Sequence, residues 1–578
     1  MDPIGVTGLG IAAAGFAIQL FEAGLAAYKV FTDAKSLGAD SGMLQSKLMI
    51  QYVRLLEWGD EAGLTKGETG IDPRLRTQTL LFEAVVSALS NIRGILTDVE
   101  SLQKRYGLRI EKRLVEPEVL SVDGPNQQEV VSLAGFPEPH FLARTAISDA
   151  IKKREEEAKR TQKALGTLKK LRWAIYDKTK FRDLMEELES MNNGLCSLIP
   201  PEHIARALLG HLLRTDDRST LACVQNAAQD HYPSLHTAAL FKDFYLGLSD
   251  LDNAPSMSLP DSSNIQFHQR PPENAVRTVA VYQPAGSDSA TSVLVEWKYF
   301  LPKWRDALER TMLNRMNAVA RLLNHVPKPE GFRTLHCFGY MEDAAGIHRR
   351  FGLVYRLPNP NTSSKSLYNL LSDEVTDSYQ VPFLGDRFRL ALVLVTALYE
   401  LHLTNWLHKS IRSDNILFFM RKGVDVSSLI NSPYLVGFDY SRPESATEAS
   451  EQPSDIAFDL YRHPDYRSGS TTYRREFDIY SIGVVLVEIG LWTKIKSFYQ
   501  YGDTPHRFKQ ILLEECLGEL GSSMGTIYRD AVKVCLSGAL VGEAVNDSSS
   551  ASEIEEMKYK LMDAFLAKVV KELSRCRA

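Results

Sequence analysis

The sequence lacks the cysteine pairs and the charge imbalance that mark several classes of protein. Its six cysteines are scattered over 578 residues with no C-x-x-C pair, which argues against a zinc finger or a disulfide scaffold and favours a reducing compartment. A net charge of −5 is not the strongly basic balance of a nucleic-acid binder. Neither H-E-x-x-H nor G-x-x-x-x-G-K-[ST] occurs. We therefore expect no metal site and no nucleic-acid partner.

The chain does have an ordinary globular composition over several domain lengths. Hydrophobic residues make up 44% and charged residues 24%, and a chain this long buries a large core without staples. A Pro-, Ser- and Asp-bearing stretch, Asp252–Asn264, is typical of a linker. We expect a multidomain protein with a helical domain over 1–215, a helical brace and linker over 216–264, and a third domain over 265–578.

The N-terminus carries an uncharged run from Pro3 to Phe21. As a helix it would span roughly 28 Å, close to the hydrocarbon core of a bilayer, although its glycines and the following Glu22 and Lys29 suit a permanent anchor poorly. Three interpretations stay open: a buried helix of a soluble bundle, a constitutive membrane span, and a segment that inserts into lipid after a trigger. The side chains that would meet lipid are Ile4, Val6, Leu9, Ile11, Phe16 and Leu20.

Apolar residues then recur at helical spacing. The series from Leu44 to Leu55 and from Leu81 to Leu102 predicts two helices. A loop is expected over Glu118–Pro139, and a third helical block from about Phe141 to Met191. No sustained strand alternation occurs, so the pattern predicts an all-α bundle. The residues expected to be buried near the end of the third block are Trp173, Phe181, Leu184 and Leu188.

The third helical block is also basic. Between Lys152 and Asp183 twelve Lys and Arg residues stand against five acidic ones. Two main interpretations remain open: a solvated helix face, or a surface for anionic lipid headgroups, at roughly 1 kcal/mol per basic residue near the membrane. A nucleic-acid surface is the least favoured alternative, because few aromatic residues are interleaved with the basic ones.

Four separated motifs of this region resemble the fungal HET-s prion-inhibition domain, called HeLo. They are the glycine- and alanine-rich Ile4–Gly15, then Leu44–Gln51, Arg54–Leu64 and Leu171–Phe181. The resemblance covers roughly residues 1–215. It implies a helical bundle whose N-terminal segment inserts into membranes and kills the cell in fungal heterokaryon incompatibility.

After residue 264 the periodicity changes. Val276–Tyr282 and Ser292–Phe300 are rich in β-branched and aromatic residues and predict two strands. A helix is expected at about Trp304–Asn324, followed by strands at Thr334–Gly339 and Phe351–Leu357. Strands followed by helices indicate an α+β domain.

Later motifs resemble a protein kinase from about residue 270 to 570. Trp406–Phe418 has the frame of the catalytic loop H-R-D-L-x-x-x-N. Tyr434–Ser441 spans the D-F-G position, Phe477–Glu488 is similar to the buried helix that follows it, and Val293–Lys298 is similar to the strand that bears the ATP lysine. The resemblance implies a bilobal kinase-like fold. In this frame His408, Phe438 and Asp478 are structural, and Lys298 and Asn415 are the positions for a nucleotide.

The catalytic groups of a kinase are missing from this frame. Phosphoryl transfer needs a carboxylate that accepts the substrate proton and another that holds magnesium, but these positions are Ser410 and Gly437. There is no convincing G-x-G-x-x-G and no glutamate near residue 316 to pair with Lys298. Asp414 and Asp439 are alternative carboxylates if the register slips. The sequence therefore favours a pseudokinase that requires no cofactor, with weak ATP binding left open.

The combination of a membrane-active bundle and a degenerate kinase is similar to the architecture of the mixed-lineage kinase domain-like protein. We hypothesise a latent fungal cell-death effector, cytoplasmic until activation moves it to the plasma membrane. Its expected partners are membrane lipids, an upstream signalling protein or receptor and, as an open alternative, further copies of itself. The segment Leu240–Leu248 is a candidate brace. Alternative functions are an atypical active Ser/Thr kinase with an N-terminal interaction domain, and a soluble signalling scaffold.

Overall fold

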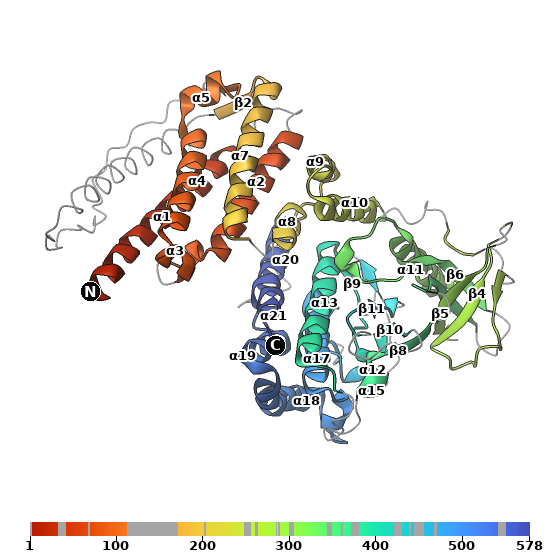
Figure 1. Ribbon diagram of the computed structural model, residues 1–578. Helices are drawn as coiled ribbons and strands as arrows, with labels where there is room; N and C mark the ends of the chain where they lie inside the picture. Colours follow the sequence, from red (N-terminus) through yellow and green to blue (C-terminus); the bar gives the residue numbers. More distant parts are fainter. Residues whose placement is uncertain are drawn as a thin grey trace, which may run out of the picture. The chain divides into compact units, whose positions relative to one another are not determined.

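The computed structural model in Figure 1 describes two compact units. It describes residues 3–578 except 33–41, 68–69, 112–171, 201–203, 248–255, 260–263, 285, 287–288, 300–305, 344–348, 360–361, 372–380, 421–429, 439–440, 444–455, 468–470 and 541–550. The N-terminal unit comprises Met1–Leu212 and Ala222–His236. The C-terminal unit comprises Leu213–Leu221 and Thr237–Ala578.

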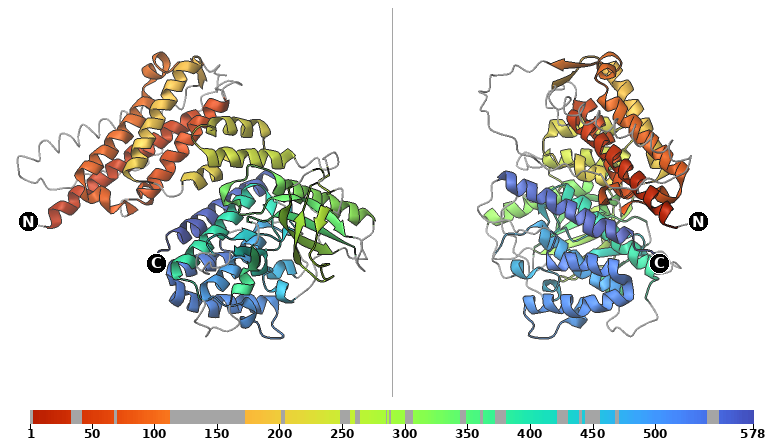
Figure 2. Two further views of the ribbon diagram at one scale, coloured as in Figure 1. Left: turned by 45° about the vertical axis from the view of Figure 1, so that its right-hand side comes forward. Right: turned by 90° about the vertical axis from the view of Figure 1, so that its left-hand side faces the viewer.

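The N-terminal unit is helical, as predicted. Helix α1 packs against α2 and α4, and α7 packs against the same two helices, so that the four lie side by side (Figures 1 and 2). Two more helices, α9 and α10, each contribute residues to both units. The bounds are α1 (Pro3–Thr32), α2 (Gly42–Glu61), α3 (Pro73–Thr77), α4 (Thr79–Thr97), α5 (Val99–Lys104), α7 (Lys178–Leu198), α8 (Ile204–Leu212), α9 (Arg218–Ala228) and α10 (Pro233–Gly247).

The core of this unit is built on large aromatic side chains from α1 and α2. Phe21 and Trp58 are buried, and α2 carries Gly59 where it meets α1. A Cβ atom at Gly59 would lie 2.1 Å from the ring of Phe21, so only glycine allows this close packing. The four side chains expected to be buried near the third block, Trp173, Phe181, Leu184 and Leu188, are all buried.

The prediction of one helical block from about Phe141 to Met191 is wrong at residues 172–175. Arg172–Ile175 forms a strand, β2, that pairs antiparallel with β1 (Leu108–Glu111). Helix α7 begins only at Lys178, because the carboxylate of Asp177 accepts hydrogen bonds from the backbone N–H groups of the first turn. The run Trp-Ala-Ile-Tyr has the aromatic and β-branched character of a strand. The expected loop 118–139 and most of the basic block, 152–171, lie outside the described residues.

The uncharged run Pro3–Phe21 lies on helix α1. The side chains of Ile4, Val6, Leu9 and Ile11 lie outside those described, whereas Phe16 packs against the core and Leu20 is buried in it. Among the described residues, one stretch is long and apolar enough to cross a membrane by length and composition alone, Leu80–Thr97 of α4.

The C-terminal unit contains both sheets and helices, as predicted. One sheet has five antiparallel strands in the order β3-β4-β5-β7-β6, and α11 packs beside β6 (Figure 1). Each predicted strand and the predicted helix has a counterpart, although β6 begins three residues later than expected. The bounds are β3 (Ile265–Gln266), β4 (Arg277–Tyr282), β5 (Thr291–Tyr299), α11 (Asp306–Asn324), β6 (Cys337–Asp343) and β7 (Arg350–Arg356).

The rest of this unit is mainly helical and is organised around helix α17 (Arg475–Leu491), which is buried from Phe477 to Gly490. This helix packs against α13 and α19. Short strands lie between the helices and position the loop that follows α13. The bounds are β8 (Ser363–Ser366), α13 (Leu384–Leu403), β9 (Trp406–Leu407), β10 (Ile416–Met420), β11 (Tyr434–Leu435), β12 (Arg442–Pro443), α18 (Pro505–Ile511), α19 (Leu517–Ser537), α20 (Ala551–Phe565) and α21 (Lys571–Ser574).

Candidate functional site

The backbone of the loop after β9 is hydrogen bonded to a buried carboxylate of α17. Asp478 accepts hydrogen bonds from the backbone N–H of His408 at 2.8 Å and of Lys409 at 2.9 Å. The hydroxyl of Tyr473 donates to the same carboxylate at 2.7 Å. Lys409 has φ 67, a strained conformation for a residue with a side chain. Asp478 therefore stabilises the conformation of the loop by accepting hydrogen bonds from the loop's backbone.

His408 and Phe438 complete this support. The two rings pack with centroids 4.5 Å apart, and both side chains are buried. Burial lowers the pKa of His408 to about 4, so its imidazole is neutral at pH 7. The structure thus brings together the three side chains that the sequence assigned to structural roles, His408, Phe438 and Asp478.

The amide of Asn415 closes the loop onto Ser410. Its Nδ2 donates to the carbonyl oxygen of Ser410 at 2.7 Å and to its Oγ at 3.0 Å. The kinase resemblance would require a proton-accepting carboxylate at position 410, and the residue there is a serine. The hydroxyl is hydrogen bonded to Asn415, and a serine hydroxyl is a poor base at neutral pH.

Two structural features disfavour any residue other than glycine at position 437. Its φ of 85 lies in the left-handed region, which strains residues that carry a Cβ atom. A Cβ atom here would also lie 2.2 Å from Nδ2 of Asn415. An aspartate at this position would have to displace Asn415. The alternative carboxylate, Asp439, lies outside the described residues.

The sheet contributes an ion pair that the sequence analysis did not identify. Arg277 on β4 donates from Nε to Oε1 of Glu296 on β5 at 2.8 Å. The same guanidinium donates from Nη1 to the carbonyl oxygen of Asp414 at 2.8 Å, and from Nη2 to Oδ1 of Asn415. The other carboxylate oxygen of Glu296 accepts from the backbone N–H of Gly437 at 3.0 Å. We call Arg277, Glu296, Asn415 and Gly437 the cleft network.

The cleft network already uses the side chain of Asn415, one of the two positions that the kinase resemblance assigns to a nucleotide. Phosphates next to Asn415 would meet the carboxylate of Glu296, whose side chain is only 3% exposed, and would have to displace Arg277 from Asn415. Lys298 lies two residues after Glu296 on β5 and is buried. The sequence did contain a signal for this ion pair. Glu296 is a carboxylate within the apolar run Val293–Lys298, and buried carboxylates are usually paired with a cation.

A second buried carboxylate supports the other side of the loop. Glu488 of α17 accepts from the hydroxyl of Tyr461 and the backbone N–H of Ile495, at 2.8 and 2.9 Å. Tyr461 in turn is 2.8 Å from Oγ of Ser413 in the loop. Burial raises the pKa of Glu488 to about 8, so the carboxyl group is largely protonated at pH 7.

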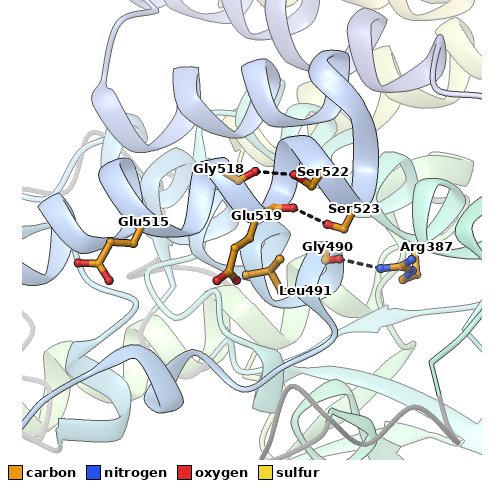
Figure 3. Close-up of a pocket in the computed structure, with 8 residues that line it drawn as sticks. All are labelled: Arg387, Gly490, Leu491, Glu515, Gly518, Glu519, Ser522 and Ser523. Carbon is orange, nitrogen blue, oxygen red and sulfur yellow. Dashed lines mark hydrogen bonds between the residues drawn. The ribbon is translucent and has the colours of Figure 1, made fainter.

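Figure 3 shows a separate cavity of about 580 Å³ that contains none of these residues. Its polar groups are largely bonded to nearby backbone. Arg387 donates to the carbonyl oxygen of Gly490 at 2.7 Å, and Ser523 donates to that of Glu519 at 2.9 Å. Among the described residues, no group of three or more His, Cys, Asp or Glu side chains could hold a metal ion.

Two family models match the chain. Residues 344–576 match a domain of unknown function, DUF7580, whose description names no activity. No curated protein matches the sequence. Residues 8–223 match the HeLo family, described as prion-inhibition and propagation, which confirms the resemblance of the N-terminal part. Residues 8–223 of this chain are therefore similar to the HeLo family, which is associated with fungal cell death and heterokaryon incompatibility.

Proposed function

We propose that this protein is a latent effector of fungal cell death, in which a kinase-like C-terminal unit restrains a membrane-permeabilising HeLo domain. The HeLo match over residues 8–223 carries the proposal. The cell would hold the restrained form in the cytoplasm, and an upstream signalling protein would release it to the plasma membrane.

Several features support a kinase-like fold for the C-terminal unit. It combines a five-stranded antiparallel sheet and helix α11 with a helical part built around α17. The loop with the catalytic frame lies on the buried carboxylate of Asp478. Ser410 and Gly437 replace the two catalytic carboxylates, and the cleft network satisfies Asn415 internally. These features favour a regulatory unit over an enzyme, with ATP at most a weak ligand near Lys298 and Asn415.

The brace supports control of the HeLo domain by the C-terminal unit. We define the brace as residues 213–221 and 237–247. The ammonium of Lys242, whose side chain is 1% exposed, donates to the carbonyl oxygen of Leu213 at 2.6 Å and pairs with Asp216 at 2.9 Å. Asp216 also accepts from Asn405, which follows α13. Phe241 packs on Phe332 with ring centroids 4.8 Å apart. The brace helices α9 and α10 continue into the N-terminal unit, so the chain itself links brace position to the bundle.

Membrane attack would use the uncharged run of α1. The half of α1 that carries Phe16 and Leu20 packs in the bundle core, so insertion would require the bundle to open. The basic block between Lys152 and Asp183 would then meet anionic headgroups, and several copies would assemble to form the lesion.

Dye release from vesicles tests the proposal. We expect the full chain to cause only weak dye release from the vesicles. Lys242→Ala should increase leakage from anionic vesicles, because it removes the cation that ties the brace together. Adding Gly10→Asp and Ala13→Asp to that variant should abolish the leakage, since charges in the apolar run oppose insertion.

The matched control is Lys560→Ala, which removes an equally charged but exposed side chain. Leakage should stay at the wild-type level. If neither the full chain nor Lys242→Ala releases dye at any lipid composition, membrane attack is removed from the proposal. A soluble signalling scaffold then becomes the better description.

A further inference from the structure

A second cavity, of about 440 Å³, lies within the C-terminal unit where the brace meets the end of helix α11. Its walls combine polar and apolar side chains, which is typical of sites for small molecules. The residues that matter for its chemistry are Arg218, Asp243, Phe244, Arg321 and His325.

The cavity has more cationic groups than its own residues neutralise. Arg218 is paired: its Nε and Nη2 donate to the carboxylate of Asp243 at 2.8 and 3.2 Å. Arg321 has no such partner. Its Nη1 is buried and, among the described residues, lacks any hydrogen-bond acceptor. The lining therefore holds one guanidinium charge that the described side chains do not compensate.

His325 presents a second unsatisfied nitrogen beside this charge. It follows Arg321 by four residues at the end of α11, and its Nε2 is likewise buried without a hydrogen-bond partner among the described residues. The imidazole stacks on the ring of Phe244, with centroids 4.2 Å apart and planes at 16°. Buried donors of this kind cost free energy unless an acceptor satisfies them.

We propose that this cavity binds a small organic phosphate. The phosphate group would accept hydrogen bonds from Arg321 and His325, because guanidinium groups pair well with phosphate oxygens and a phosphate has enough oxygens for both donors. The organic part would lie along Phe244 and the apolar brace residues. The cavity is larger than a bare ion needs, which favours an anion attached to an apolar body. This inference does not depend on membrane activity.

Isothermal titration calorimetry of the full chain tests this with three probes: phenyl phosphate, inorganic phosphate and phenol. We expect phenyl phosphate to bind most tightly, since it alone supplies both the anion and the ring. Arg321→Gln should weaken its affinity at least tenfold. Arg315→Gln, which removes a charge from the same helix away from the cavity lining, should leave the affinity unchanged.

Thermal unfolding separates a ligand role from a structural one. Without ligand, Arg321→Gln should unfold at the same temperature as the wild type or higher, because it removes a half-buried charge whose Nη1 is buried without an acceptor among the described residues. With phenyl phosphate, the wild type should gain thermal stability and the variant should not. A lower unfolding temperature of the unliganded variant would assign Arg321 a structural role and overturn the proposal.

The source of the phosphate is distinguished with vesicles of phosphatidylcholine, with and without phosphatidate. Co-sedimentation that requires both phosphatidate and Arg321 would indicate a lipid headgroup as the natural ligand. Binding of phenyl phosphate without such co-sedimentation would indicate a soluble ligand. If the folded wild type binds no phosphate probe, or if Arg321→Gln binds as tightly, the proposal is wrong.

Discussion

Arg54 is buried in the N-terminal unit and Arg277 is half-buried in the C-terminal unit, and the two arginines are compensated differently. In the bundle, Arg54 is 7% exposed and bonds to neutral groups, among them the hydroxyl of Tyr232 at 3.0 Å and Oδ1 of Asn193 at 2.5 Å. In the C-terminal unit, Arg277 faces the carboxylate of Glu296. Among the described residues Arg54 has no carboxylate partner.

The difference bears on which region is able to rearrange. A guanidinium held by neutral dipoles loses little when it reaches water, because water offers equally good acceptors. A buried ion pair loses its compensation when either partner leaves. The bundle therefore holds its charge in a way compatible with opening, whereas separating Arg277 from Glu296 would leave a buried carboxylate without its cation.

The largest expected effect comes from breaking the Arg277–Glu296 ion pair of the C-terminal unit. Arg277→Ala leaves the carboxylate of Glu296 buried without its cation and should destabilise the C-terminal unit by about 3–5 kcal/mol. Urea unfolding, followed by the fluorescence of the C-terminal tryptophans, measures the loss. The double variant Arg277→Met with Glu296→Leu should recover most of it. If the single and double variants lose the same stability, the loss does not come from an uncompensated Glu296 carboxylate.

A smaller effect is expected for the bundle. Arg54→Met removes the charge but leaves Gln51, Asn193 and Tyr232 with fewer hydrogen bonds, at a cost of about 1–3 kcal/mol. The same urea experiment, followed by far-UV circular dichroism, checks this. A loss larger than that of Arg277→Ala would contradict the comparison between the two arginines.

The protonated carboxyl group of Glu488 predicts a pH dependence confined to the C-terminal unit. Folding raises its pKa from 4.5 to about 8, so the unfolded state releases this proton first and stability falls as pH rises between those values. His408 has the opposite sign: its pKa is lowered from 6.5 to about 4, and its contribution is lost as pH falls through that range. The window from pH 6.5 to about 8 therefore separates the contribution of Glu488 from that of His408.

Urea titrations across that window test the assignment. Glu488→Gln, which stays neutral at every pH, should flatten the decline in stability. Glu519→Gln on α19 is the control, because its side chain is exposed, and it should keep the wild-type slope. An unchanged slope in Glu488→Gln would contradict a raised pKa.

The smallest expected effect is on phosphoryl transfer. Neither the wild type nor Lys298→Ala should transfer phosphate above background, because Ser410 and Gly437 supply no carboxylate. Restoring both as Ser410→Asp and Gly437→Asp should not create activity either, since a Cβ atom at Gly437 collides with Asn415. A radiolabelled phosphate-transfer assay measures this. Activity in the wild type that disappears in Lys298→Ala would restore the atypical kinase as the better description.

Much of the element pattern was predictable because it depends on local periodicity. The apolar spacing of Leu44–Leu55 corresponds to α2, and the strand character of Val276–Tyr282 to β4. The failure at Arg172–Ile175 has a local cause too. The block around it favours helix, but the strand forms because Leu108–Glu111, more than 60 residues earlier, pairs with it, and such pairing is invisible to periodicity.

By itself, the sequence determined the HeLo resemblance, the α+β character of the C-terminal half, and the presence of Ser410 and Gly437 where the kinase resemblance would require carboxylates, because residue identity and spacing carry these directly. Only the tertiary structure decided which side chains surround these two positions. Arg277 and Asn415 are separated by 138 residues, and Arg218 and Arg321 approach one cavity from different helices. Hydrogen bonds and charge compensation act over a few ångströms in space, so distances along the chain do not predict them.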